Sequence, residues 1–132
     1  MEHALGSCRV RSDQDIERLV EQRLPTAILA SLLDYGLTET EIHAVILPRR
    51  TLSHRKAKRE DLTREESDRA VRLARILALA EEVFGDLQKS FRWLRSRKSR
   101  LDDRSPLEVL STEAGARLVE EMLYQIDEGM PG

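Results

Sequence analysis

Residues 63–85 read TREESDRAVRLARILALAEEVFG, and this stretch decides the fold. Thr63 and Glu66 have the spacing of a capping box, in which two side chains bond each other's backbone at the start of a helix. Between Leu73 and Ala80 only Arg75 is polar. A helix that is apolar nearly all round is a buried one, and Gly85 is a typical stop. The stretch predicts a long central helix, the spine of a C-terminal body.

The segments on both sides of this stretch also show helical periodicity and helix-end residues. Ser12 is suited to cap a helix over residues 12–24, and Pro25 to open one that Gly36 stops. The other expected helices span residues 38–47 (a second capping box, Thr38 and Glu41), 51–59, 86–95 and 106–110, with a last one from Thr112 whose apolar stripe is Leu118, Val119, Met122, Leu123 and Ile126. The sequence predicts an all-α fold, with a disordered start (1–11), a helix-turn-helix head (12–61) and a helical body (62–132).

The composition supports helices and an intracellular setting. Charged residues make up 35% of the chain and aromatic residues only 4%, a balance typical of helical proteins. The single Cys8 has no intramolecular disulfide partner, which indicates a reducing compartment. No apolar run reaches the roughly 18 residues of a membrane span. We expect a cytoplasmic protein without membrane contact.

The net charge of −2 conceals a segregation of charge along the chain. Two segments, 49–59 and 89–100, contain basic residues and no acidic ones, whereas residues 105–132 are acidic apart from Arg117. Segregated charge favours two different partners, although each basic run alone is also compatible with a solvated helix face. The basic residues are Arg49, Arg50, Arg55, Lys56, Lys58 and Arg59 in the first run, and Lys89, Arg92, Arg95, Arg97, Lys98 and Arg100 in the second.

The segment from Thr38 to Lys58 predicts a helix-turn-helix, with a tight turn at residues 47–50. The second helix has only Leu52 and Ala57 as apolar residues, so no broad core face holds it and its exposed side is available to an anion. Such a helix can lie in the major groove of DNA, but a proline-containing turn also occurs in ordinary helical hairpins. The candidate DNA-binding residues are Arg49, Arg50, Thr51, Ser53, His54, Arg55 and Lys58.

The acidic last helix is the second candidate surface. Tyr124 beside a tail with Met130 favours a protein interface, because Tyr and Met are enriched there. A solvated helix face is the alternative interpretation. The candidate partner-binding residues are Glu113, Arg117, Glu120, Glu121, Tyr124, Gln125, Glu128 and Met130.

Catalysis has little support in the sequence. His3, His43 and His54 are scattered, and no group of residues has the spacing of metal ligands. There is no Gly-rich phosphate loop, and adjacent acids such as Glu65 and Glu66 point about 100° apart on a helix. We expect no enzyme activity, no metal and no cofactor.

A series of short motifs resembles one known family, the Xre-type antitoxins (Xre/MbcA/ParS) that carry a C-terminal toxin-binding domain and partner RES-domain toxins. The motifs occur in the family's order, which makes the set far more specific than a helix-turn-helix match alone. They are residues 46–55 (ILPRRTLSHR), 62–69 (LTREESDR), 74–76 (ARI), 80–85 (AEEVFG), 93–94 (WL), 106–110 (PLEVL) and 112–117 (TEAGAR).

The resemblance implies a division of labour between head and body. The head would bind operator DNA and repress the chain's own operon. The body would form a homodimer and cover the active site of a RES-domain toxin that consumes NAD, with the last helix and tail nearest the toxin. One departure is that family members often have glycines before the proline, where this chain has residues 101–105 (LDDRS). A stand-alone transcription regulator without a toxin is the alternative function.

Overall fold

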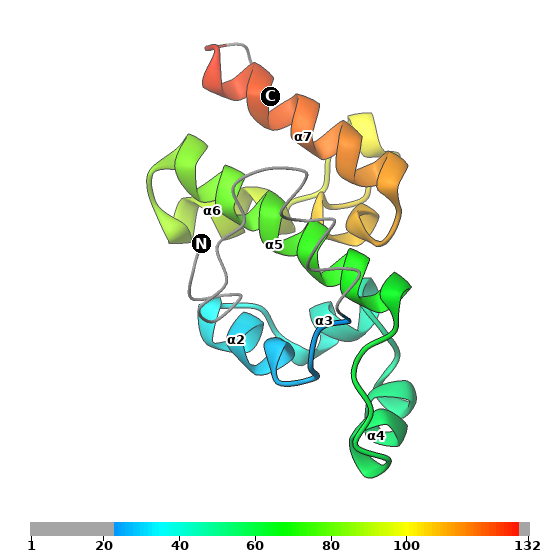
Figure 1. Cartoon of the computed structure of the whole chain (residues 1–132). Helices are drawn as coiled ribbons and strands as arrows, with labels where there is room; N and C mark the ends of the chain where they lie inside the picture. Colours follow the sequence, from blue (N-terminus) through cyan, green and yellow to red (C-terminus); the bar gives the residue numbers. More distant parts are fainter. Residues whose placement is uncertain (1–22, 130–132) are drawn as a thin grey trace.

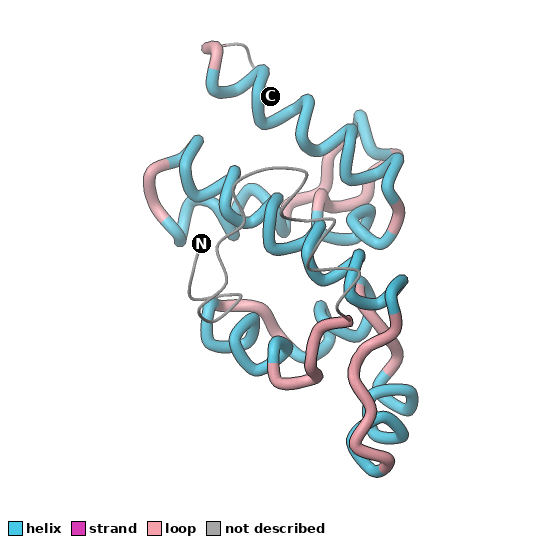
Figure 2. Tube along the Cα trace, in the orientation of Figure 1, coloured by secondary structure: helices cyan, strands magenta, loops and turns pink. Residues whose placement is uncertain are grey.

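Every regular element of the described chain is a helix (Figures 1 and 2). The computed structural model describes residues 23–129. In chain order the elements are α2 (Ile28–Tyr35), α3 (Glu39–Val45), α4 (Arg49–Ala57), α5 (Arg64–Phe84), α6 (Leu87–Arg95), the 3₁₀ helices η2 (Ser99–Leu101) and η3 (Leu107–Ser111), and α7 (Glu113–Asp127). The all-α prediction is confirmed. The start at residues 1–11 and nearly all of the helix expected over 12–24 lie outside the described residues. Within residues 23–129, no helix is long and apolar enough to span a membrane.

Helix α5 is the centre of the molecule, as the sequence predicted. It begins with the capping box of Thr63 and Glu66 and ends at Gly85, whose left-handed backbone closes the helix. Its buried residues include Leu73, Ala74, Ile76, Leu77 and Ala80. Helices α6 and α7 pack along it. In Figure 1, α2, α3 and α4 lie on one side of α5 and α7 lies on the opposite side.

Two helices begin at other positions than expected. Helix α2 begins at Ile28 instead of Pro25, because the amides of Ile28 and Leu29 bond the carbonyls three residues before them, at Pro25 and Thr26, in a tight turn. Helix α4 begins at Arg49, two residues early, because Pro48 has extended backbone and its carbonyl accepts the first hydrogen bond of the helix, from the Leu52 amide. The connection between α3 and α4 is therefore only residues 46–48, and Arg50 belongs to the helix instead of the turn.

The segment between α6 and η3 has an unusual backbone. Asp102 and Asp103 both have positive φ, at 56° and 62°, in the left-handed region where glycine is favoured. Aspartate is among the few other residues that visit this region, because its short polar side chain can bond locally. The chain thus makes this turn with aspartates and without glycine. This segment also buries Leu101.

Helix α7 is seated closely on η3. Thr112 caps it by accepting a hydrogen bond from the Gly115 amide at 3.0 Å. A Cβ placed on Gly115 would lie 1.9 Å from the backbone oxygen of Val109, so only glycine allows this approach. Of the expected stripe, Val119, Met122 and Leu123 are buried and Ile126 is partly buried. Leu118 is 46% exposed, so its assignment to the buried stripe was wrong: it lies beyond the edge of the face that α5 covers.

We predict that Gly115→Ala lowers the free energy of unfolding by about 1–3 kcal/mol, because the added methyl forces backbone atoms apart in a packed interface. Urea denaturation followed by circular dichroism measures this change. Leu118→Ala, on the exposed side of the same helix, should change the same quantity by only about 0.5 kcal/mol. Equal stability of Gly115→Ala and the unmodified chain would show that α7 is not seated on η3.

Candidate functional site

Helix α4 protrudes from the rest of the molecule (Figure 1). None of its residues is buried, and Leu52 is its only hydrophobic residue that packs, partly buried, against the core. This confirms that no broad apolar face holds the helix. Of the candidate DNA-binding residues, Arg49, Arg50, Ser53, His54 and Lys58 are exposed, Thr51 is half-buried, and Arg55 points toward the body.

Helices α3 and α4 form a helix-turn-helix around a short, buried connection. Val45, Ile46 and Leu47 are buried, so the turn is fixed to the core. Arg69 of α5 donates a hydrogen bond from Nε to the Ile46 carbonyl at 2.8 Å, and this bond also holds the turn in place. At the surface, Arg49 lies 3.4 Å from the Glu39 carboxylate. Both side chains are well exposed, so this pair contributes little to stability.

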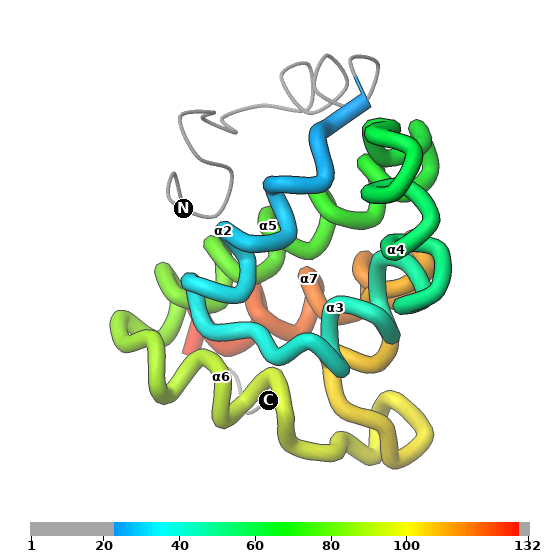
Figure 3. Tube along the Cα trace, turned by 90° about the horizontal axis from the view of Figure 1, so that it is seen from below, coloured from blue at the N-terminus to red at the C-terminus, as the bar shows by residue number. Residues whose placement is uncertain are grey.

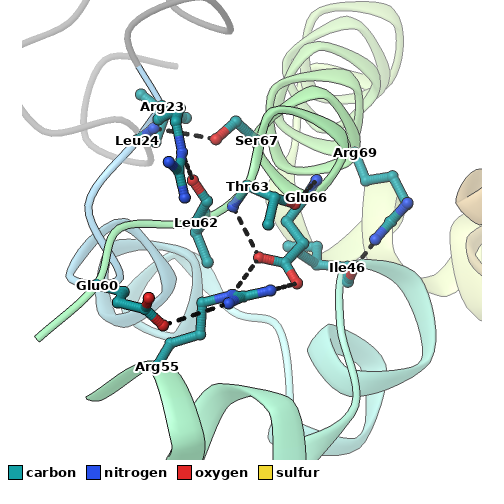
Figure 4. A network of polar contacts seen from close by, with 10 residues as sticks. All are labelled: Arg23, Leu24, Ile46, Arg55, Glu60, Leu62, Thr63, Glu66, Ser67 and Arg69. Carbon is teal, nitrogen blue, oxygen red and sulfur yellow. Dashed lines mark hydrogen bonds and ion pairs between the residues drawn. The ribbon is translucent and has the colours of Figure 1, made fainter. Parts of the chain in front are cut away.

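An ion pair between the half-buried Arg55 and the buried Glu66 attaches α4 to α5 (Figure 4). The Arg55 guanidinium donates from Nε to one Glu66 oxygen at 2.8 Å and from Nη2 to the other at 3.1 Å. Glu66 is only 5% exposed and also accepts a hydrogen bond from the Thr63 amide at 2.9 Å. Glu60 lies 3.6 Å from the same guanidinium. The sequence indicated Glu66 as a capping residue and gave no sign of its bond to a residue eleven positions earlier.

The surroundings of Glu66 keep it ionised. Burial of the carboxylate raises its pKa, but the hydrogen bonds from Arg55 and from the Thr63 backbone outweigh burial and hold the pKa below its ordinary value. Because the folded-state pKa is lowered, the pair stabilises the fold at neutral pH and loses this contribution as the pH falls through that lowered pKa.

The second basic segment divides into bonded and unbonded residues. Arg95, at the end of α6, donates to both Glu41 oxygens at 2.8 and 3.0 Å and to the Gly36 carbonyl at 2.9 Å. It thereby ties α6 to the first turn of α3. Arg100 bonds the Gln125 side chain of α7 at 2.7 Å. Lys89 and Arg92 are exposed and have no ion-pair partner within residues 23–129.

The acidic candidate residues lie along α7, on the far side of α5 from α4 (Figure 1). Tyr124 is 50% exposed, although tyrosine offers a large apolar surface. Glu113 and Arg117 form an exposed pair at 3.4 Å, and the half-buried Glu120 lies 3.7 Å from Arg75 of α5. Glu121 and Glu128 are exposed and Gln125 is half-buried, while Met130 lies outside the described residues.

The described residues offer no cluster that could hold a metal. Between residues 23 and 129, no group of three or more His, Cys, Asp or Glu side chains has the arrangement of a metal site. His43 contacts the Leu47 carbonyl through Nδ1 at 3.1 Å, in the turn between α3 and α4. His54 lies exposed on α4. His3 and Cys8 lie outside the described residues.

Two family descriptions match consecutive parts of the chain. Residues 15–75 match the antitoxin Xre-like helix-turn-helix domain, and residues 79–129 match the antitoxin Xre/MbcA/ParS C-terminal toxin-binding domain. The division falls inside α5. The N-terminal part of this helix therefore completes the helix-turn-helix domain, and its C-terminal part opens the toxin-binding domain.

Two curated proteins called "Antitoxin Xre" are similar to the chain. The one from Pseudomonas putida is 39% identical over 118 residues, which cover 89% of this chain and 74% of that protein. The one from Yersinia enterocolitica is 32% identical over 90 residues, which cover 67% of this chain and 61% of that protein. With a helix-turn-helix domain, a toxin-binding domain and this degree of identity, the chain belongs to the Xre antitoxin family.

Proposed function

We propose that the chain represses its own operon through α4 and neutralises a RES-domain toxin through α7. The observation that carries the proposal is the separation of two opposite surfaces, a protruding basic α4 and an acidic α7, on the two sides of α5. In this division, residues 12–61 bind DNA and residues 62–132 bind the toxin and form the homodimer. Covering the toxin's active site would keep it from cytoplasmic NAD without the antitoxin binding NAD itself.

The exposed side of α4 is suited to the major groove. Arg50, Ser53, His54 and Ala57 follow one another at helical spacing on one face. Arginine pairs bidentately with guanine, while hydroxyl and lysine side chains bind phosphate oxygens. A homodimer would present two copies of α4 to two half-sites about one turn of DNA apart, roughly 34 Å.

We predict that Arg50→Ala lowers affinity for the promoter DNA of the chain's own operon by about 1–3 kcal/mol and relaxes its sequence preference. Arg50 is a better target for substitution than Arg49, because Arg49 also contacts the Glu39 carboxylate. Electrophoretic mobility shifts with promoter and unrelated duplexes measure both effects. Arg117→Ala, which removes the same charge from α7, should leave DNA binding unchanged. If Arg50→Ala binds both duplexes as the unmodified chain does, α4 is not the reading helix.

Arg55 has a different role in this proposal from its neighbours on α4. Its guanidinium donates two hydrogen bonds to Glu66, so it holds the helix in place instead of contacting a base. Glu66 does not lie on α4, but it sets the helix orientation through this pair.

We expect Glu66→Gln to weaken promoter binding about tenfold and to lower the free energy of unfolding by about 2 kcal/mol, because a buried charge partner is lost. Arg55→Lys should weaken binding similarly, since an ammonium cannot make the two parallel bonds. Helical circular dichroism controls for unfolding. Full DNA affinity in a folded Glu66→Gln variant would contradict the positioning role.

The toxin surface is best tested by point substitutions. Removing residues 112–132 would also remove Val119, Met122 and Leu123, which belong to the core. Tyr124 is exposed and is a residue type that often dominates interface energies. Glu121 and Glu128 provide charge beside it.

For the double variant Tyr124→Ala with Glu121→Lys, we predict at least about tenfold weaker binding to the RES-domain protein encoded beside the antitoxin gene. Growth rescue on co-expression should fail, while promoter binding and stability stay unchanged. Asp34→Lys, an exposed acid on α2, is the matched charge control. Intact neutralisation by the double variant would place the toxin elsewhere.

A further inference from the structure

We propose that a second basic surface, formed by Lys89, Arg92, Arg97 and Lys98, binds the phosphate backbone of the DNA that α4 reads. This inference rests on the proposed DNA binding and deepens it. The four residues lie on α6 and at the start of the segment that follows it. We call them the α6 basic surface.

Among the described residues, the α6 basic surface has a single and exposed ion pair. Lys89 and Arg92 have no ion-pair partner within residues 23–129. Arg97 has one contact, to Asp103 at 3.7 Å, and both side chains are more than 70% exposed, so water screens the pair. Lys98 lies 5.1 Å over the Trp93 ring, a contact that leaves its charge in place. An unneutralised group of cations favours an anionic partner.

The α6 basic surface lies close to the helix proposed to read DNA, and this position favours DNA as its partner. In the first turn of α3, Glu39 contacts Arg49 of α4, and Glu41 contacts Arg95 of α6. The start of α4 and the end of α6 therefore both lie beside the same helical turn. Figure 3 shows α3 between α4 on one side and α6 with its following segment on the other.

This order matches the way a helix-turn-helix sits on DNA. The second helix enters the major groove while the first helix crosses the sugar-phosphate backbone. Here α3 is the first helix, so the strand that it crosses continues toward α6. Cations there would contact phosphates that flank the bases read by α4.

The composition of the surface also favours phosphate over a protein partner. Protein interfaces are centred on buried apolar or aromatic anchors, whereas phosphates require only charge and hydrogen-bond donors. Among the described residues, the large hydrophobics that are well exposed are Leu33, Leu87, Leu118 and Tyr124, and only Leu87 lies on α6, at 36% exposed. Lysine, present twice in the surface, is depleted at protein interfaces.

The test is the salt dependence of DNA binding by the full-length chain with Lys89→Gln, Arg92→Gln and Arg97→Gln combined. These three side chains are exposed, so the fold should be retained. Each lost phosphate contact lowers the slope of log affinity against log salt by about 0.9, so we expect a decrease of about 2–3. Affinity at roughly 0.15 M salt should fall about tenfold or more, equally for promoter and unrelated duplexes.

Two controls make the result specific. The charge-conserving triple variant (Lys89→Arg, Arg92→Lys, Arg97→Lys) should keep the affinity and slope of the unmodified chain. Arg117→Gln on α7 should also keep both. An unchanged slope in the glutamine variant overturns the inference, and so does a variant that binds DNA normally but loses the toxin.

The outcomes also separate this inference from the proposed reading helix. Changes in α4 alter the preference for promoter over unrelated DNA, whereas changes in the α6 basic surface alter affinity for both equally. If Arg50→Ala removes sequence preference while the glutamine variant has no effect, the α6 inference alone fails. If Arg50→Ala has no effect either, the proposed role of α4 fails first.

Discussion

The carboxylate of Glu66 is the contact on which the position of α4 depends. It caps α5 at the Thr63 amide and receives two hydrogen bonds from Arg55, so a single side chain begins one helix and holds another. A buried ion pair is not in general a source of stability, because desolvation offsets the attraction. Here the ion pair serves to orient α4. It is needed for this because α4 has no buried residue, and its only apolar contact with the core is the partly buried Leu52. A bidentate guanidinium fixes orientation as well as distance, which a second apolar contact would not do.

Helix α5 explains how one short chain serves two partners. Its first turn holds α4 through Glu66, and Arg69 holds the turn between α3 and α4. Farther along, the same helix carries α7, with Arg75 close to Glu120. The two matched domains divide within this helix, between residues 75 and 79. A continuous, buried helix has few internal degrees of freedom, so the two surfaces are held in a fixed relation and not connected by a flexible linker.

Local signals in the sequence predicted the fold well, and long-range contacts were not visible in it. Both capping boxes, the stop at Gly85 and the start of the last helix at Thr112 depend on residues a few positions apart, and all are present. The start of α2 was misplaced because the tight turn at residues 25–29 competes with a helix begun by Pro25. Leu118 shows another limit: periodicity gives the direction of an apolar stripe, but the neighbouring helices decide how wide the covered face is. The pairing of Arg55 with Glu66 joins residues across a loop, and no pattern in the sequence marks it.

Counting charges along the chain also could not separate cations that serve the fold from cations left for a partner. Each basic run places one arginine in a bidentate bond with an acid on another helix: Arg55 bonds Glu66, and Arg95 bonds Glu41. The contact of Arg49 with Glu39 is single and exposed. Arg55 holds α4 against the start of α5, and Arg95 holds α6 against the first turn of α3. Of the remaining cations, Arg50, Lys89 and Arg92 are exposed and have no ion-pair partner within residues 23–129. Glu41 and Glu66 would not contact an anionic partner themselves. They influence its binding because their bonds to Arg95 and Arg55 position the helices that carry the unpaired arginines and lysines.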